Sequence, residues 1–237
     1  MTLLSQDEIA ARRAAAIESI ARAAEKSGRA PATIDLLAVT KGQPAEVVLR
    51  AARAGCRLFG ENRVAEAAEK IQAVRAEFPA LTWKLIGPLQ TNKAALALQW
   101  FAMVESVDRQ RLADRLERLL EGSPRLLPVL LEVNLAGEAT KSGASAEGVV
   151  ALARAVAASP HLDCRGVMAV PPFDPDPERA RPWFRQLREI RDRIEGSLGR
   201  KLPEISAGMS HDFTVAVEEG STQVRLGTAL FGPREEA

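Results

Sequence analysis

The chain has 237 residues, of which 46% are hydrophobic and 27% are charged, a composition that suits one large globular domain and argues against intrinsic disorder. Lys and Arg number 32 against 31 Asp and Glu, so the formal net charge of +1 provides no electrostatic footprint for nucleic acid or an anionic membrane. Two cysteines, two histidines and no tyrosine exclude a disulfide scaffold, a Cys/His metal cluster and any mechanism that requires a tyrosine base.

The N-terminal segment predicts a helix and not a targeting signal. Ser5 and Glu8 have the spacing of a capping box, and the helix is expected over residues 8–26. Its charged residues leave no apolar core of a signal peptide. Because no run of about eighteen apolar residues occurs in the chain, we expect a soluble, cytoplasmic protein.

Beyond residue 30, short apolar runs alternate with amphipathic helical patterns. Strands are predicted at 34–40, 57–60, 83–87, 103–107, 128–135, 164–170, 204–207 and 223–226. Helices are expected between most of them, at 44–54, 64–77, 92–99, 110–121, 146–157, 177–195 and 211–218. Strands that alternate with helices predict a parallel sheet, and eight such units of about 30 residues fit a (β/α)8 barrel.

The predicted fold class is therefore α/β, as a single (β/α)8 TIM-type barrel with an extra N-terminal helix. We expect one domain over residues 1–237, in which residues 1–30 form the N-terminal helix packed on the barrel. An open, doubly wound sheet is the alternative.

Lys41 stands directly after the first predicted strand, whose residues 36–39 are apolar. Functional residues of such barrels gather at the carboxyl ends of strands, so Lys41 would project into the barrel mouth. A lysine that is desolvated there can act as an amine nucleophile and form a Schiff base with a carbonyl compound. The alternative is a lysine whose stem covers apolar surface while its ammonium stays in water.

The ends of the seventh and eighth predicted strands have the features of a phosphate site. Gly208 and Gly227 would allow close backbone approach, Ser210 and Thr228 offer hydroxyls, and helical segments follow both. Alternatively, the glycines only make tight turns. A lysine amine beside a phosphate site suggests a phosphorylated aldehyde. Pyridoxal 5′-phosphate (PLP) is the leading candidate, and a sugar phosphate handled by a Schiff-base aldolase is the rival.

Six segments match one protein family in order along nearly the whole chain. They are residues 37–41 (LAVTK), 59–63 (FGENR), 86–93 (IGPLQTNK), 133–134 (VN) with Glu138, Lys141 and Gly143, 208–212 (GMSHD) and 220–232 (GSTQVRLGTALFG). The chain thus resembles the pyridoxal phosphate homeostasis proteins (the YggS/PROSC family), which look like the N-terminal barrel domain of alanine racemase standing alone.

This resemblance implies that Lys41 carries PLP as a covalent imine and that Arg225 faces the pyridine nitrogen. One departure is visible, because Lys84 stands where the family usually has histidine after the tryptophan of strand three. If the side chain at that position touches the cofactor, Lys84 changes the electrostatic surroundings of the cofactor in this chain. The cofactor-binding residues that the resemblance implies are Lys41, Asn62, Ser210, Arg225, Gly227 and Thr228.

The predicted function is a PLP carrier or buffer that holds the cofactor without turnover and keeps its free level low. Arg225 stays charged and disfavours protonation of the ring nitrogen, and an unprotonated ring is a weak electron sink. Alternatively, Arg225 braces the barrel mouth through an acidic neighbour such as Glu61. The expected partners are PLP and PLP-dependent apoenzymes, without nucleic acid or membrane, and the chain is expected to be a monomer.

Two other functions remain open. A PLP-dependent amino-acid racemase or related enzyme would resemble the racemase family, which uses a tyrosine from a separate domain as its second base, whereas this chain has no tyrosine. The other is a regulatory module that docks to a partner, which the sequence does not itself support, because surface helices such as 177–195 are charged and show no large apolar stripe.

Overall fold

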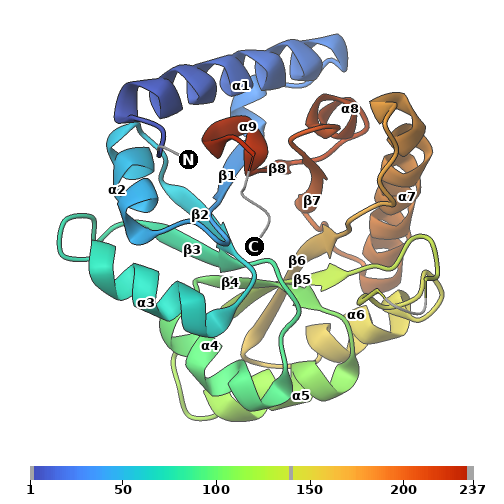
Figure 1. Ribbon diagram of the computed structural model, residues 1–237. Helices are drawn as coiled ribbons and strands as arrows, with labels where there is room; N and C mark the ends of the chain where they lie inside the picture. The colour runs from blue at the N-terminus through green and yellow to red at the C-terminus, as the bar shows by residue number, and fades with distance from the viewer. Residues whose placement is uncertain (1–2, 139–140, 234–237) are drawn as a thin grey trace.

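Eight parallel strands form a closed barrel in sequence order, in which β1 pairs with both β2 and β8 (Figure 1). The computed structural model describes residues 3–138 and 141–233, so the outermost residues of the expected domain lie outside the described part. The prediction of a (β/α)8 barrel is confirmed, and the alternative of an open sheet is wrong. All predicted strands are present, with ends that differ by a few residues at most.

The strands and helices alternate along the chain as the apolar runs predict. The strands are β1 (Asp35–Val39), β2 (Leu58–Glu61), β3 (Thr82–Leu85), β4 (Met103–Val107), β5 (Leu127–Glu132), β6 (Leu162–Met168), β7 (Glu204–Met209) and β8 (Gln223–Leu226). The α-helices are α1 (Gln6–Lys26), α2 (Ala45–Arg53), α3 (Val64–Val74), α4 (Ala94–Trp100), α5 (Gln110–Leu120), α6 (Val149–Ala157), α7 (Arg181–Leu198), α8 (Phe213–Glu218) and α9 (Thr228–Phe231). Short 3-10 turns lie at Pro31–Thr33, Thr91–Lys93 and Pro177–Ala180.

Helix α1 begins at the predicted capping box. The Ser5 hydroxyl accepts a hydrogen bond from the Glu8 backbone N–H, and the Glu8 carboxylate accepts one from the Ser5 N–H. The helix buries Ile9 and Ile20 and contacts α2, α8 and α9, so it packs on the barrel beside both its first and last helices (Figure 1). In the described part of the chain, no helix is long and apolar enough to span a membrane.

Helix α7 has an apolar face that its charged sequence conceals. Phe184, Leu187, Ile190 and Ile194 follow helical spacing and are all buried. The expectation that segment 177–195 lacks a large apolar stripe is therefore wrong. Because that stripe packs against the barrel and α6, the helix does not offer it to a partner.

The interior of the barrel is more polar than the layer between strands and helices. The carboxylate of Glu105 accepts hydrogen bonds from the Ser206 hydroxyl and from the Gln223 amide, each at 2.7 Å. Lys84 donates to the Gln223 side-chain oxygen. These bonds join β3 and β4 to β7 and β8, which are not neighbours in the sheet, so the side chains meet inside the barrel.

Candidate functional site

The end of β1 and the end of β8 enclose one small cavity. Lys41, Gln43, Gly227 and Thr228 line this cavity, whose volume is about 40 Å³. The two strands are hydrogen-bonded neighbours, so their carboxyl ends necessarily open side by side. The structure thus brings the predicted lysine to Gly227 and Thr228, two of the four residues predicted for the phosphate site.

Ser210 reaches the same place from the end of β7. Its hydroxyl oxygen accepts a hydrogen bond of 3.0 Å from the backbone N–H of Ala229, in the first turn of α9. A Cβ atom placed on Gly227 would meet only Val39, at 3.5 Å or more. The packing of the protein does not itself require glycine there, and open space remains beside the backbone for a ligand.

Gly208 has a different explanation from the one that its position in the sequence suggests. Its φ of +92° is a conformation that side chains rarely adopt, and a Cβ atom there would lie 2.6 Å from the Ala216 side chain. Gly208 therefore makes the turn after β7 and lets α8 pack closely on that strand. Close approach to a ligand is not needed to account for it.

Oδ1 of Asn62 and Oε2 of Glu132, a pair of buried acceptor oxygens near the carboxyl ends of β2 and β5, have no hydrogen-bond partner among the described residues. The same is true of Oε2 of Glu61, whose side chain faces Lys70 of α3. Burial raises the pKa of Glu132, although Ser142 and Arg225 oppose this shift. Unsatisfied buried polar atoms are rare and usually mark a place for a ligand or water, so the pair fits a polar guest in the barrel mouth.

Arg225 is buried inside the barrel, where it is 4% exposed. Its guanidinium donates to the backbone oxygen of Ala169 at 2.7 Å, and to the backbone oxygen and hydroxyl of Ser206 at 3.3 Å each. Burial lowers the pKa of Arg225, while the carboxylates of Glu105, Glu132 and Asp212 act in the opposite direction.

The expected bracing contact between Arg225 and Glu61 is wrong. Glu61 is the last residue of β2, and its Oε1 accepts hydrogen bonds from Lys70 of α3 at 2.8 Å and from the Thr40 hydroxyl at 2.7 Å. Side chains alternate between the two faces of a strand. Because Gly60 takes the inward position, where a Cβ atom would meet Leu37, the Glu61 side chain points away from the barrel interior. Arg225 is braced instead by Ala169, directly after β6, and by Ser206 within β7.

Lys84 does not line the cavity beside Lys41. It lies near the amino ends of the strands, within 3.6 Å of the carboxylates of Glu105 and Glu204, in a surface hollow that Thr82 also lines. The departure from the family pattern at this position therefore changes the charge inside the barrel and not the composition of the mouth.

Lys70 is a further candidate functional residue, which none of the strand-end motifs contains. It is buried on the same face of α3 as Ala67, Ile71 and Val74. A lysine on an apolar helical face, four residues after Glu66, is a recognisable signal for a buried ion pair. Its ammonium donates to the backbone oxygen of Thr40, directly before Lys41.

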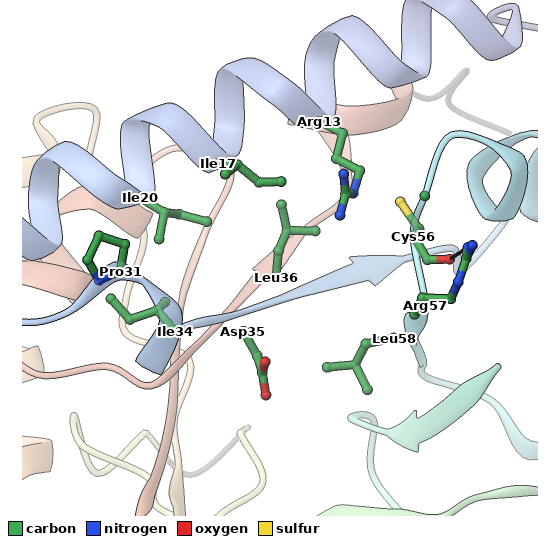
Figure 2. Close-up of a pocket in the computed structure, with 11 residues that line it drawn as sticks. Arg13, Ile17, Ile20, Pro31, Ile34, Asp35, Leu36, Cys56, Arg57 and Leu58 are labelled. Atoms are coloured by element: carbon green, nitrogen blue, oxygen red, sulfur yellow. Dashed lines mark hydrogen bonds between the residues drawn. The ribbon is translucent and has the colours of Figure 1, made fainter. Parts of the chain in front are cut away.

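A second cavity, of about 320 Å³, lies between α1 and the amino ends of β1 and β2 (Figure 2). Ile17, Ile20 and Leu36 give it an apolar wall, and Arg57 lies at one end, where its guanidinium donates to the Cys56 backbone oxygen. Burial raises the pKa of the Cys56 thiol, so it is a poor nucleophile. This cavity contains none of the predicted site residues, and it lies at the opposite end of β1 from Lys41.

The fold and the chain's sequence both point to one class of barrel. The family described as alanine racemase, N-terminal domain, matches residues 14–235. Alanine racemase from Corynebacterium glutamicum has the same fold, with a TM-score of 0.70 at 19% identity over 100% of this chain and 65% of that one. The molecule is thus a racemase-type barrel.

More similar relatives narrow the class. The pyridoxal phosphate homeostasis protein of Pseudomonas aeruginosa is 46% identical over 218 residues, which is 91% of each chain. The Aquifex aeolicus protein of the same name is 40% identical over 219 residues, 92% of this chain and 95% of that one. PipY of Synechococcus elongatus, solved with PLP bound, has a TM-score of 0.82 at 34% identity, over 94% of this chain and 100% of its own. The chain belongs to the family of the pyridoxal phosphate homeostasis proteins.

Proposed function

We propose that the chain binds PLP reversibly through Lys41 and serves intracellular PLP homeostasis without turnover. The observation that carries this proposal is the cavity shared by Lys41, Gly227 and Thr228. The name of the relatives and the PLP bound to PipY support the same ligand. Residues 1–237 would act as one PLP-binding domain, with residues 1–30 as its N-terminal helix.

Each proposed residue has a distinct task. Bound PLP supplies a reactive aldehyde and an electron-accepting ring. The Lys41 amine attacks the aldehyde carbon, a C=N bond replaces the C=O bond, and one water molecule leaves, which gives a Schiff base. Ser210, Gly227 and Thr228 hold the phosphate through hydroxyl and backbone N–H groups, and Asn62 offers its unpaired oxygen to a polar group of the ring.

Arg225 explains why binding would not lead to catalysis. An arginine side chain remains charged even when it is buried, so Arg225 opposes a second positive charge on the pyridine nitrogen. A ring that stays unprotonated withdraws electrons weakly. The chain also has no tyrosine to act as a second base. Both features favour storage of the cofactor over racemisation.

The same proposal includes an oligomeric state, a class of recipient proteins and a cellular location. One barrel contains all six proposed residues, which supports a monomer as the working form. The proposed recipients are PLP-dependent apoenzymes, whose own lysine amines compete for the same aldehyde. A cytoplasmic location is supported by the free thiols of Cys56 and Cys164, as a reducing compartment keeps them.

The direct test uses the unmodified protein loaded with PLP. After reduction with borohydride and digestion, the cofactor label should appear on the peptide that contains Lys41. The same loaded protein, incubated with L-alanine, should form no D-alanine above the level given by free PLP. A label on another lysine overturns the attachment site, and steady racemisation overturns the non-catalytic role.

Removing the hydroxyls of Ser210 and Thr228 together, as Ser210→Ala with Thr228→Val, should weaken PLP binding. Each hydrogen bond to a charged group contributes about 1.5–3 kcal/mol. Titration calorimetry with PLP and with pyridoxal, which lacks the phosphate, measures the effect. The affinity for pyridoxal should hardly change. Equal weakening of both ligands would show that the substitutions damage the barrel mouth and that the phosphate assignment is wrong.

A further inference from the structure

A buried cluster of charged side chains lies directly behind the proposed attachment site. Lys70 of α3 is 6% exposed and Glu61 at the end of β2 is fully buried. The Lys70 ammonium donates to Glu61 at 2.8 Å, to Glu66 at 2.7 Å and to the backbone oxygen of Thr40 at 2.6 Å. All three of its protons therefore have acceptors.

This cluster holds the backbone on both sides of Lys41. On the preceding side, the Thr40 carbonyl is bound to Lys70, and the Thr40 hydroxyl is bound to Glu61 at 2.7 Å. On the following side, the backbone N–H of Gly42 donates to Glu66 at 2.7 Å, on the same oxygen that binds Lys70. A single ammonium thus connects to both flanking peptide groups, once directly and once through a carboxylate.

The charges of the cluster are well suited to this task. Burial raises the pKa of Glu61, although Lys70 and Thr40 oppose the shift. Burial also acts to raise the pKa of Glu66, but the hydrogen bonds from Lys70 and Gly42 outweigh it and leave that pKa below its ordinary value. Buried ion pairs are a poor source of stability compared with apolar packing, so a specific geometry is the better explanation for this one.

We propose that Lys70 is a positioning residue, which fixes the Thr40–Gly42 backbone so that the Lys41 amine meets the aldehyde of PLP in a reactive geometry. This inference rests on the proposed function of Lys41. Lys70 lines no part of the cavity beside Lys41, so it acts through the backbone and not on the ligand. A misplacement of about 1 Å can reduce a reaction rate by about 100-fold. Loss of Lys70 should therefore slow covalent attachment while non-covalent binding persists.

The test compares two ligands that differ only at the reacting carbon. PLP carries the aldehyde, whereas pyridoxine 5′-phosphate carries an alcohol and cannot condense with an amine. In Lys70→Met, the attachment rate at saturating PLP should fall about 10- to 100-fold. The affinity for pyridoxine 5′-phosphate should stay within about twofold of wild type, since one buried contact away from the ligand is changed. Gln72→Met, an exposed position on the same helix, is the matched control and should behave as wild type.

Because Lys70→Met leaves Glu61 buried without a cation, a second variant protects the test against misfolding. Glu61→Gln with Lys70→Met removes both charges and keeps a hydrogen-bond partner for Thr40. The pH dependence of the attachment rate separates positioning from electrostatics. Positioning lowers the rate plateau reached once the Lys41 amine is fully deprotonated, whereas a purely electrostatic effect moves the pH midpoint and leaves the plateau unchanged.

The outcomes distinguish this inference from the function on which it rests. If reduction labels Lys41 in the wild type but either folded variant attaches PLP at the wild-type plateau rate, Lys70 does not position Lys41 and the proposed function stands. If the affinity for pyridoxine 5′-phosphate falls as much as the attachment rate, the role of Lys70 is structural only. If the wild-type label lies on another lysine, both proposals fail.

Discussion

Replacing Lys41 with alanine should abolish the covalent labelling of the protein by PLP and borohydride. The amine of Lys41 is the group at the end of β1 that shares a cavity with Gly227 and Thr228. Without that amine, no Schiff base can form there, and the absorbance band of the bound cofactor should revert to that of the free aldehyde. Absorbance spectra and intact-mass spectrometry after reduction measure the loss.

The control for this variant is Lys93→Ala, because Lys93 is exposed in the turn that follows β3 and is a plausible target for adventitious labelling. Lys93→Ala should keep the full label. Lys41→Ala should still bind PLP weakly, through the phosphate group of the ligand. A Lys41→Ala protein that is reduced to the same extent as wild type, with its label on Lys84 or Lys93, would contradict the assignment.

Replacing Arg225 with methionine should destabilise the barrel by about 3–5 kcal/mol, the usual result of removing one partner from a buried ionic cluster. The guanidinium binds Ala169, directly after β6, and Ser206 within β7, and it offsets the charges of Glu105 and Glu132. Urea unfolding at neutral pH measures this loss. Arg225→Lys keeps the positive charge and should recover part of the lost stability.

The Arg225→Met effect should depend on pH, and the sign follows from Glu132. Burial already raises the pKa of Glu132, and Arg225 is one of the groups that oppose the shift. Without Arg225, the folded-state pKa rises further above the unfolded value, so stability is retained at low pH and lost as pH rises through the folded pKa. The difference from wild type should be smaller at pH 5 than at pH 8. A difference independent of pH would show that lost packing alone causes the effect.

The sequence predicts the barrel well because its signals are local and repeated. Each apolar run is short, each helix has its own stripe, and the capping box at Ser5 marks the first helix. The ends of strands bring Lys41, Ser210 and Thr228 to one mouth because all parallel strands point in the same direction.

The parts that the sequence does not predict depend on contacts between distant elements. The true partners of Arg225 are a hydroxyl and two backbone carbonyls on β7 and after β6, which no spacing rule identifies. The role of Gly208 depends on how closely α8 approaches, and the location of Lys84 depends on the depth of its position along β3. The buried residues of α7 do recur at helical spacing in the sequence, but the many charged residues between them make this pattern hard to recognise.

The pairing of β1 with β8 has a consequence for the newly made chain. A polypeptide that has not yet reached Gln223 lacks β8, so β1 has an unpaired edge and the proposed ligand site lacks Gly227 and Thr228. Pairing the first strand with the last is entropically costly and slow, and a ligand that binds only the closed form favours closure by mass action. During synthesis, the chain should therefore gain affinity for PLP only once β8 has been made. A chain that holds PLP is then one whose barrel has closed.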